Sequence, residues 1–142
     1  MSDLVVASSV AIKWFVVEPY STEARRILTD YQAGILTFHA PDLINAEIGN
    51  IVWKKQRFHG VAQADAQAII DVFRTLTIVR TPTADLLDTA YRLAVLYQCT
   101  VYDMLYVALS IREACPMVTA DEKLVHAIGR TFPNIIWLGQ WP

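Results

Sequence analysis

The chain has 142 residues, with 12 basic and 14 acidic side chains and a formal net charge of −2 at pH 7. This length suits one domain, so we expect a single domain over residues 1–142. Hydrophobic residues make up 54% of the chain and charged residues 18%, which excludes a disordered chain and predicts an apolar face for a partner or a second copy. The near-neutral balance excludes a protein that holds nucleic acid by overall charge, so any such contact must be local.

The cellular compartment is predicted from features that the sequence lacks. Cys99 and Cys115 form neither a CxxC pair nor a disulfide framework, and we expect them to be small core residues. The start, MSDLVVASSV, lacks the basic segment and long apolar run of a secretory signal peptide. No apolar stretch reaches the roughly 18–20 residues of a membrane span. These features predict a cytoplasmic protein that does not enter a membrane.

Short apolar runs alternate along the chain with longer segments of helical spacing. Strands that alternate with helices predict an α/β fold, a three-layer α/β/α sandwich around a mostly parallel five-stranded sheet. Ligands bind such sheets beyond the carboxyl ends of the strands. In chain order, we predict strand 4–8, helices 9–17 and 21–33, strand 35–38, helices 41–58 and 63–76, strand 77–80, helices 83–97 and 101–113, strand 117–120, helix 122–128 and strand 135–138.

Three acidic residues do not fit the solvent-facing pattern of the others, and each also has a purely structural explanation. Glu47 lies on the apolar stripe of its helix, where a carboxylate is costly unless its charge is compensated; a local donor such as Asn50 is the structural alternative. Asp103 follows Thr100 by three residues, which is the spacing of a capping box. Asp121 follows a strand and opens a helix, as an N-cap does.

The predicted topology brings these three acids toward one edge of one sheet. Carboxylates held close together raise each other's proton affinity, and a divalent cation removes that penalty. Hard oxygen ligands suit Mg²⁺ or Mn²⁺. Such an ion lowers the pKa of a bound water and stabilises charge on a phosphate.

Four segments carry a resemblance to a known family: VVASSVAIKWF, APDLINAEIGN, TVYDMLYVALS and VTADEKL. In this order and spacing they resemble the four motif regions of PIN-domain ribonucleases, above all the VapC-type toxins of toxin–antitoxin pairs. The resemblance covers almost the whole chain. It implies a single PIN-like domain, a metal-dependent endoribonuclease activity, a cognate antitoxin as partner, an RNA substrate and a homodimer.

The resemblance also implies roles for individual residues. Glu47, Asp103 and Asp121 match the acids of the second, third and fourth regions, which hold the metal and carry catalysis. Ser9 matches a small polar residue near the first acid, and Thr119 matches a hydroxyl residue before the fourth. We expect these two to make polar contacts in the site.

The first region departs from the family pattern at Ala7. The family places an aspartate at the end of the first strand, and an alanine side chain cannot bind a metal. Asp3 does not replace it, because we expect Asp3 to lie before the strand begins. The flanking residues favour a deliberate single substitution, and natural loss of the acid is the alternative. In either case we expect a weak or inactive nuclease on an otherwise intact scaffold.

Basic residues give a less specific signal. Lys54, Lys55 and Arg57 lie near the end of one helix. They form either a local patch that contacts RNA phosphates or a solvated helix end, where the helix dipole favours positive charge. Lys13 lies near the first motif and either reaches a phosphate or extends along the surface.

Two other functional classes compete with the enzyme. A PIN-like module that has naturally lost catalysis would bind RNA or an antitoxin without cutting. A receiver-like phosphoacceptor needs an acidic pair after the first strand and an aspartate after the third. The chain has Ala7 and Ser8 at the first place, and Thr81 and Pro82 at the second, so that class is disfavoured.

Overall fold

A parallel sheet forms the centre of the molecule in the computed structural model, which describes residues 2–142. Over these residues the sheet has five strands in the order β3-β2-β1-β4-β5, and every neighbouring pair is parallel. The strands are β1 (Ser2–Val6), β2 (Leu36–Pro41), β3 (Ile78–Thr81), β4 (Met117–Thr119) and β5 (Ile135–Trp137).

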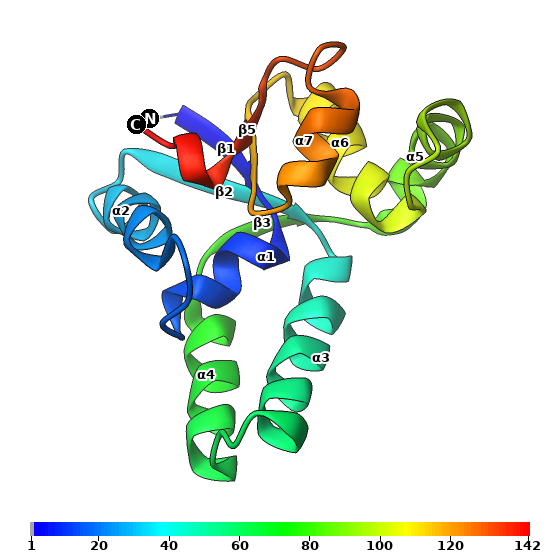
Figure 1. The fold of residues 1–142 in the computed structure, drawn as a ribbon. Helices are drawn as coiled ribbons and strands as arrows, with labels where there is room; N and C mark the ends of the chain where they lie inside the picture. The colour runs from blue at the N-terminus through cyan, green and yellow to red at the C-terminus, as the bar shows by residue number, and fades with distance from the viewer. Residues whose placement is uncertain (1) are drawn as a thin grey trace.

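Helices cover both faces of this sheet (Figure 1). Because crossovers between parallel strands are right-handed, the helices between β1 and β3 lie on one face and those after β3 lie on the other. The α3–α4 hairpin extends away from the sheet, and α5 lies at the far side of α6 (Figure 1). The helices are α1 (Ser8–Ala11), α2 (Ser21–Gln32), α3 (Leu43–Phe58), α4 (Gln63–Thr75), α5 (Thr83–Tyr97), α6 (Val101–Glu113) and α7 (Glu122–Ile128), with 3₁₀ turns η1 (Ile12–Trp14) and η2 (Leu138–Gln140).

The predicted three-layer α/β/α architecture is confirmed, but the first predicted helix is too long. The chain makes α1 and the turn η1 and then leaves the helical path before Val17. The reason is a local turn closed by Ser21, whose hydroxyl donates to the Val16 carbonyl and accepts from the Glu18 amide, both at 2.9 Å. These bonds replace a last turn of helix.

All five strands differ from the predicted bounds by one to three residues at one end or both, and the largest differences are in β1 and β2. Asp3 lies inside β1 rather than before it, paired in register with Thr37, and its carboxylate lies 3.0 Å from His39 Nε2 on β2. Pro41 was expected in the first turn of a helix but ends β2, in register with Thr81. Asp3 thus sits at the opposite end of β1 from Ala7, which agrees with its exclusion as a substitute acid.

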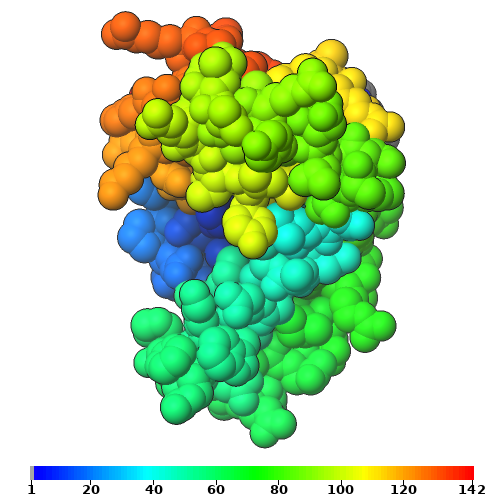
Figure 2. Space-filling model, turned by 90° about the vertical axis from the view of Figure 1, so that its right-hand side faces the viewer, coloured from blue at the N-terminus to red at the C-terminus, as the bar shows by residue number. Residues whose placement is uncertain are grey.

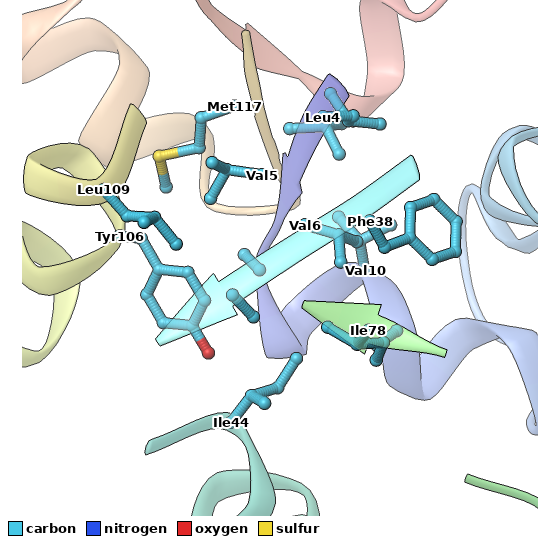
Figure 3. Close-up of a cluster of buried hydrophobic side chains, with 14 of the residues drawn as sticks. Leu4, Val5, Val6, Val10, Phe38, Ile44, Ile78, Tyr106, Leu109 and Met117 are labelled. Carbon is cyan, nitrogen blue, oxygen red and sulfur yellow. The ribbon is translucent and has the colours of Figure 1, made fainter. Parts of the chain in front are cut away.

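The core lies on both sides of the sheet because the central strands are buried throughout. Leu4, Val5 and Val6 of β1 are each at most 1% exposed, as expected for a strand covered by helices on both faces. Phe38 of β2 stacks between Trp14 and Tyr31, with ring centroids 5.0 and 4.6 Å away. Figure 3 shows these strand side chains meeting residues of α1, α3 and α6.

No single helix within residues 2–142 has the length and apolar character of a membrane span. Helices α5 and α6 taken together have both, but the pair is bent by 117° at its break.

Candidate active site

The candidate site lies where the chain direction across the sheet reverses, between the adjacent strands β1 and β4. From β1 the chain proceeds to β2 on one side, and from β4 it proceeds to β5 on the other. Ligands bind at such a switch point, beyond the carboxyl ends of the strands. Ala7 follows β1 there, buried, and its amide donates to the Val118 carbonyl of β4 at 3.1 Å. The position of the missing acid is therefore the switch point itself.

Glu47 reaches this edge from α3 and is held by two hydroxyl groups. Tyr106 of α6 donates to Glu47 Oε1 at 2.6 Å, and Ser8 donates to the same oxygen at 3.3 Å. The expected local partner Asn50 is not among its donors in the described chain. Figure 3 shows the Tyr106 hydroxyl directed toward the start of α3. Because both hydroxyls bind Oε1, these bonds leave Oε2 free to contact a ligand.

Burial raises the pKa of Glu47 above its ordinary value of 4.5. The nearby charge of Asp103 raises this pKa further, while the hydrogen bonds from Tyr106 and Ser8 lower it. Burial and the adjacent Glu47 raise the pKa of Tyr106 far above its ordinary value. Tyr106 therefore stays protonated and acts as a permanent donor to the carboxylate.

Replacing Tyr106 with phenylalanine is expected to destabilise the fold by about 1.5–3 kcal/mol, the contribution of a hydrogen bond to a charged group. The variant leaves the half-buried Glu47 with Ser8 as its one remaining donor among those described. Urea unfolding measures the loss. Tyr102→Phe is the matched control, because Tyr102 lies one turn earlier on α6 and is exposed. Equal stability of the two variants would contradict this role for Tyr106.

Asp103 lies in the first turn of α6, and the predicted N-terminal cap is confirmed. Its backbone amide donates to Thr100 Oγ1 at 3.1 Å. The side chain is half-buried, and burial raises the pKa of its carboxyl above the ordinary value of 3.8. A hydrogen bond with the Thr100 side chain lowers this pKa, and the negative charge of Asp121 raises it. The cap therefore accounts for the hydrogen bond of the Asp103 backbone amide. It does not account for the raised pKa of the Asp103 carboxyl.

Asp121 caps α7, as its place after β4 predicts. Its Oδ1 accepts from the Leu124 amide at 3.2 Å, and the residue is exposed. Ser9 and Thr119 hold the loop that carries it: Ser9 Oγ accepts from the Ala120 amide and Thr119 Oγ1 from the Asp121 amide, both at 3.1 Å. The contacts found for these two hydroxyls are thus with the backbone next to Asp121.

Neighbouring acids raise the pKa of two of these three carboxyl groups. Asp103 raises the pKa of Glu47, and Asp121 raises the pKa of Asp103. Cys99 was not predicted as part of the site, but the same charges act on it. Burial raises the pKa of its thiol most, and the charges of Asp103 and Asp121 raise it further. None of the ion pairs found in residues 2–142 involves one of the three acids. The edge therefore concentrates negative charge that no lysine or arginine neutralises there.

The carboxylate oxygens of Glu47, Asp103 and Asp121 are the type of ligand that a hard divalent cation prefers. A bound cation would also offset the repulsion between them. Within the described part of the chain, however, no three acidic, histidine or cysteine side chains are grouped closely enough to hold a metal ion. Ala7 contributes no carboxylate, and Glu47 Oε1 is already bound by Ser8 and Tyr106.

The basic residues singled out in the sequence are only partly brought together. Lys13 and Lys55 both bind Glu18, with Nζ–O distances of 3.3 and 2.8 Å. Lys54 and Arg57 are exposed, and the Arg57 guanidinium lies 5.3 Å from the centre of the Phe58 ring. The chain thus has a compact Lys13–Glu18–Lys55 cluster rather than one basic patch.

The raised pKa of Asp103 predicts how stability changes with pH. The folded chain binds this proton more tightly than the unfolded chain, so the favourable contribution is complete below the ordinary pKa of 3.8 and is lost as the pH rises through the folded pKa. Asp103→Asn removes this loss. We expect the variant to exceed the parent by about 1 kcal/mol near neutral pH and to lose that advantage as the pH falls toward about 4. Urea unfolding in EDTA at both pH values tests this, and a variant less stable than the parent at neutral pH would contradict it.

Comparisons with known proteins identify the family of the chain. Residues 4–129 match the family model of the PIN domain. Ribonuclease VapC3 of Pyrobaculum aerophilum is 30% identical over 137 residues, which cover 94% of this chain and 97% of that protein. Ribonuclease VapC9 of Mycobacterium tuberculosis strain H37Rv is 27% identical over 113 residues, which cover 77% of this chain and 87% of that protein.

Two solved structures share the fold. PAE2754 from Pyrobaculum aerophilum has a TM-score of 0.62 at 22% identity and matches 98% of this chain and 92% of its own. VapBC2 from Rickettsia felis, bound to a DNA fragment from its promoter, has a TM-score of 0.66 at 16% identity and matches 95% of this chain and 96% of its own. With a family match over most of its length and a VapC relative that is 30% identical over 97% of that protein, the chain belongs to the PIN-domain family as a VapC-type member.

Proposed function

We propose that this chain is a metal-dependent endoribonuclease toxin of a type II toxin–antitoxin system, impaired because Ala7 replaces the first acid. The observation that carries the proposal is the position of Glu47, which is held at the switch point of a PIN-type sheet by Ser8, the residue after Ala7, and by Tyr106, one turn after Asp103. Burial and a neighbouring acid raise the pKa of Glu47 and that of Asp103, and such perturbed carboxylates are typical of functional sites. The names of its relatives, which are VapC ribonucleases, support phosphodiester cleavage in RNA as the reaction.

Glu47, Asp103 and Asp121 would hold Mg²⁺ or Mn²⁺. When bound, such an ion supplies a water of lowered pKa and stabilises negative charge on a phosphate. The chain's own residues arrange these ligands. Tyr106 and Ser8 fix Glu47 through Oε1, and the hydroxyls of Ser9 and Thr119 accept from the backbone amides of Ala120 and Asp121.

RNA and an antitoxin are the proposed partners, in the cytoplasm and away from membranes. Lys13, Lys54, Lys55 and Arg57 are the candidate contacts with RNA phosphates, which position a nucleic acid without reading its sequence. The VapBC2 neighbour is a complex, which supports an antitoxin as the protein partner. A second copy of the chain is the proposed partner in a homodimer.

The test is a cleavage assay on total cellular RNA with the Ala7→Asp variant, run with Mg²⁺ and with EDTA. RNA fragments of defined size that need both the aspartate and the metal support the proposal. Intact RNA under all conditions would overturn it.

A second candidate follows from Ala7 itself. A PIN-type module that lost this acid naturally would bind RNA or an antitoxin without cutting. The codon at position 7 of the native gene separates the two candidates: an aspartate codon favours the enzyme, and an alanine codon favours the binding module.

A further inference from the structure

The C-terminal half of α3 is basic and lies at the surface. After Glu47 the helix has no further acidic residue. Its cations are Lys54, Lys55 and Arg57. Glu18 binds Lys55, but none of the ion pairs found in residues 2–142 involves Lys54 or Arg57, and both of these side chains are exposed. Figure 2 shows α3, in cyan to turquoise, at the front of the lower half of the molecule. This end of the helix can therefore accept phosphate groups.

Two aromatic side chains are exposed beside these cations. Trp53 and Phe58 are 53 and 61% exposed, and their ring centroids lie 5.9 Å apart in an edge-to-face arrangement. The Arg57 guanidinium lies over the Phe58 ring, 5.3 Å from its centre. An edge-to-face pair leaves both faces of one ring free of the other ring, and Arg57 covers one face of Phe58 alone. These contacts therefore leave at least one aromatic face open.

The spacing along α3 connects this cluster to the acidic edge. Lys54 and Phe58 follow Glu47 by seven and eleven residues, so on an α-helix both point within about 20° of the direction of Glu47. Asn50, which is exposed and comes one turn after Glu47, lies on the same side. Phe58 is roughly 16 Å from Glu47 along the helix axis. A chain-like ligand bound at Glu47 can thus follow one face of α3 to the aromatic pair.

We propose that single-stranded RNA leaves the acidic edge along this face of α3 and stacks a base on the Trp53–Phe58 pair. In this arrangement Lys54 and Arg57 contact phosphates, and the rings hold the base by stacking, which requires no particular sequence. Cations combined with stacking rings are typical of surfaces that bind single strands, because the bases of a duplex are already stacked and paired. The path begins at the proposed reaction site, which favours the RNA itself over a protein as the occupant.

The RNA affinity of the parent chain tests the stacking contact without cleavage. The probe is a fluorescein-labelled RNA of mixed sequence, about 12 nucleotides long, and its binding is followed by fluorescence anisotropy in EDTA. Phe58→Leu is expected to bind the probe roughly 5- to 100-fold more weakly, because it removes the stacking of one base. Phe58→Tyr keeps the ring and is the matched control, so it should bind like the parent. Circular dichroism checks that both variants are folded.

Two further comparisons separate stacking from charge. Phe58→Leu should leave the affinity for the same sequence in a duplex unchanged, because a duplex offers no free base. Lys54→Gln should weaken the binding of both RNAs alike and lower the slope of log affinity against log salt by about one. Arg25→Gln removes an exposed charge on α2 and should change neither the affinity nor the slope.

The inference rests on RNA as the substrate proposed above and adds that the strand is unpaired along α3. Equal affinity of Phe58→Leu and the parent for the single strand overturns it and leaves the aromatic pair to a protein partner. Equal losses in Phe58→Leu and Phe58→Tyr, or equal losses for single strand and duplex, also overturn it, as does a parent that binds no single strand. The proposed reaction is judged by cleavage in the Ala7→Asp assay, so it can hold while this inference fails.

Discussion

The Ala7→Asp variant is expected to cleave RNA at least ~100-fold faster than the parent chain in Mg²⁺. Loss of a group that merely supports a metal ligand typically costs 10- to 100-fold in metal affinity or activity, and a missing ligand costs more. Ala7 lies at the switch point, with its amide bonded to Val118 of β4 and Ser8 of the next position bonded to Glu47. A carboxylate at this place adds a fourth acid to an edge that already holds three.

Metal binding gives a readout that is independent of cleavage. Titration with Mn²⁺, followed by its paramagnetic resonance signal, should show tighter binding by Ala7→Asp than by the parent. Ala7→Asn is the matched control, because asparagine has nearly the size of aspartate but no charge. If Ala7→Asn gains as much activity and metal affinity as Ala7→Asp, the added charge is not the cause. Position 7 then does not correspond to the first acid of the family.

Phe38→Ala is expected to cost about 3–5 kcal/mol of folding free energy, the usual cost of removing a buried phenylalanine. Phe38 is completely buried and stacks between Trp14 and Tyr31, so its loss leaves a cavity between two rings that belong to different segments. The corresponding fall in Tm is roughly 10 °C or more for a chain of this size. Thermal unfolding followed by circular dichroism measures it.

Phe58→Ala provides the comparison for this prediction. Phe58 ends α3 and is exposed, with its ring against Trp53. Its removal should change the folding free energy by no more than about 1 kcal/mol, since it empties no cavity. Similar losses in the two variants would show that the stack around Phe38 does not dominate stability.

The fold could be predicted because two signals indicate the same helices and strands along most of the chain. These signals are the pattern of apolar residues and the positions of the helix-ending residues. Helices α5 and α6 have the predicted bounds, Thr83–Tyr97 and Val101–Glu113, and the side chain of Thr100 caps the start of α6. The segment after α1 was predicted as continuous helix to Val17 because Pro19 is the nearest residue that limits a helix. What ends it is the Ser21 hydroxyl, a contact from outside the segment that local periodicity does not reveal.

The acids of the site could be predicted one at a time, but the groups that hold them could not. Glu47 was noticed because a carboxylate on an apolar stripe is unusual, and its structural explanation invoked a neighbour on the same helix. Its donors instead come from residues 39 and 59 positions away along the chain, Ser8 and Tyr106. Tyr106 lies one helical turn after Asp103, which is the one local sign that it faces the site. Pairing across such distances is set by the complete fold.

Glu47, Asp103 and Asp121 belong to α3, to α6 and to the cap of α7, so the acidic edge draws on elements far apart along the chain. A nascent chain that has left the ribosome only as far as α5 still lacks two of these carboxylates. For a nuclease with the first acid in place, synthesis itself would therefore delay the harmful activity until Asp121 has left the ribosome. A binding partner already present in the cell would meet the enzyme at the moment that its edge is completed.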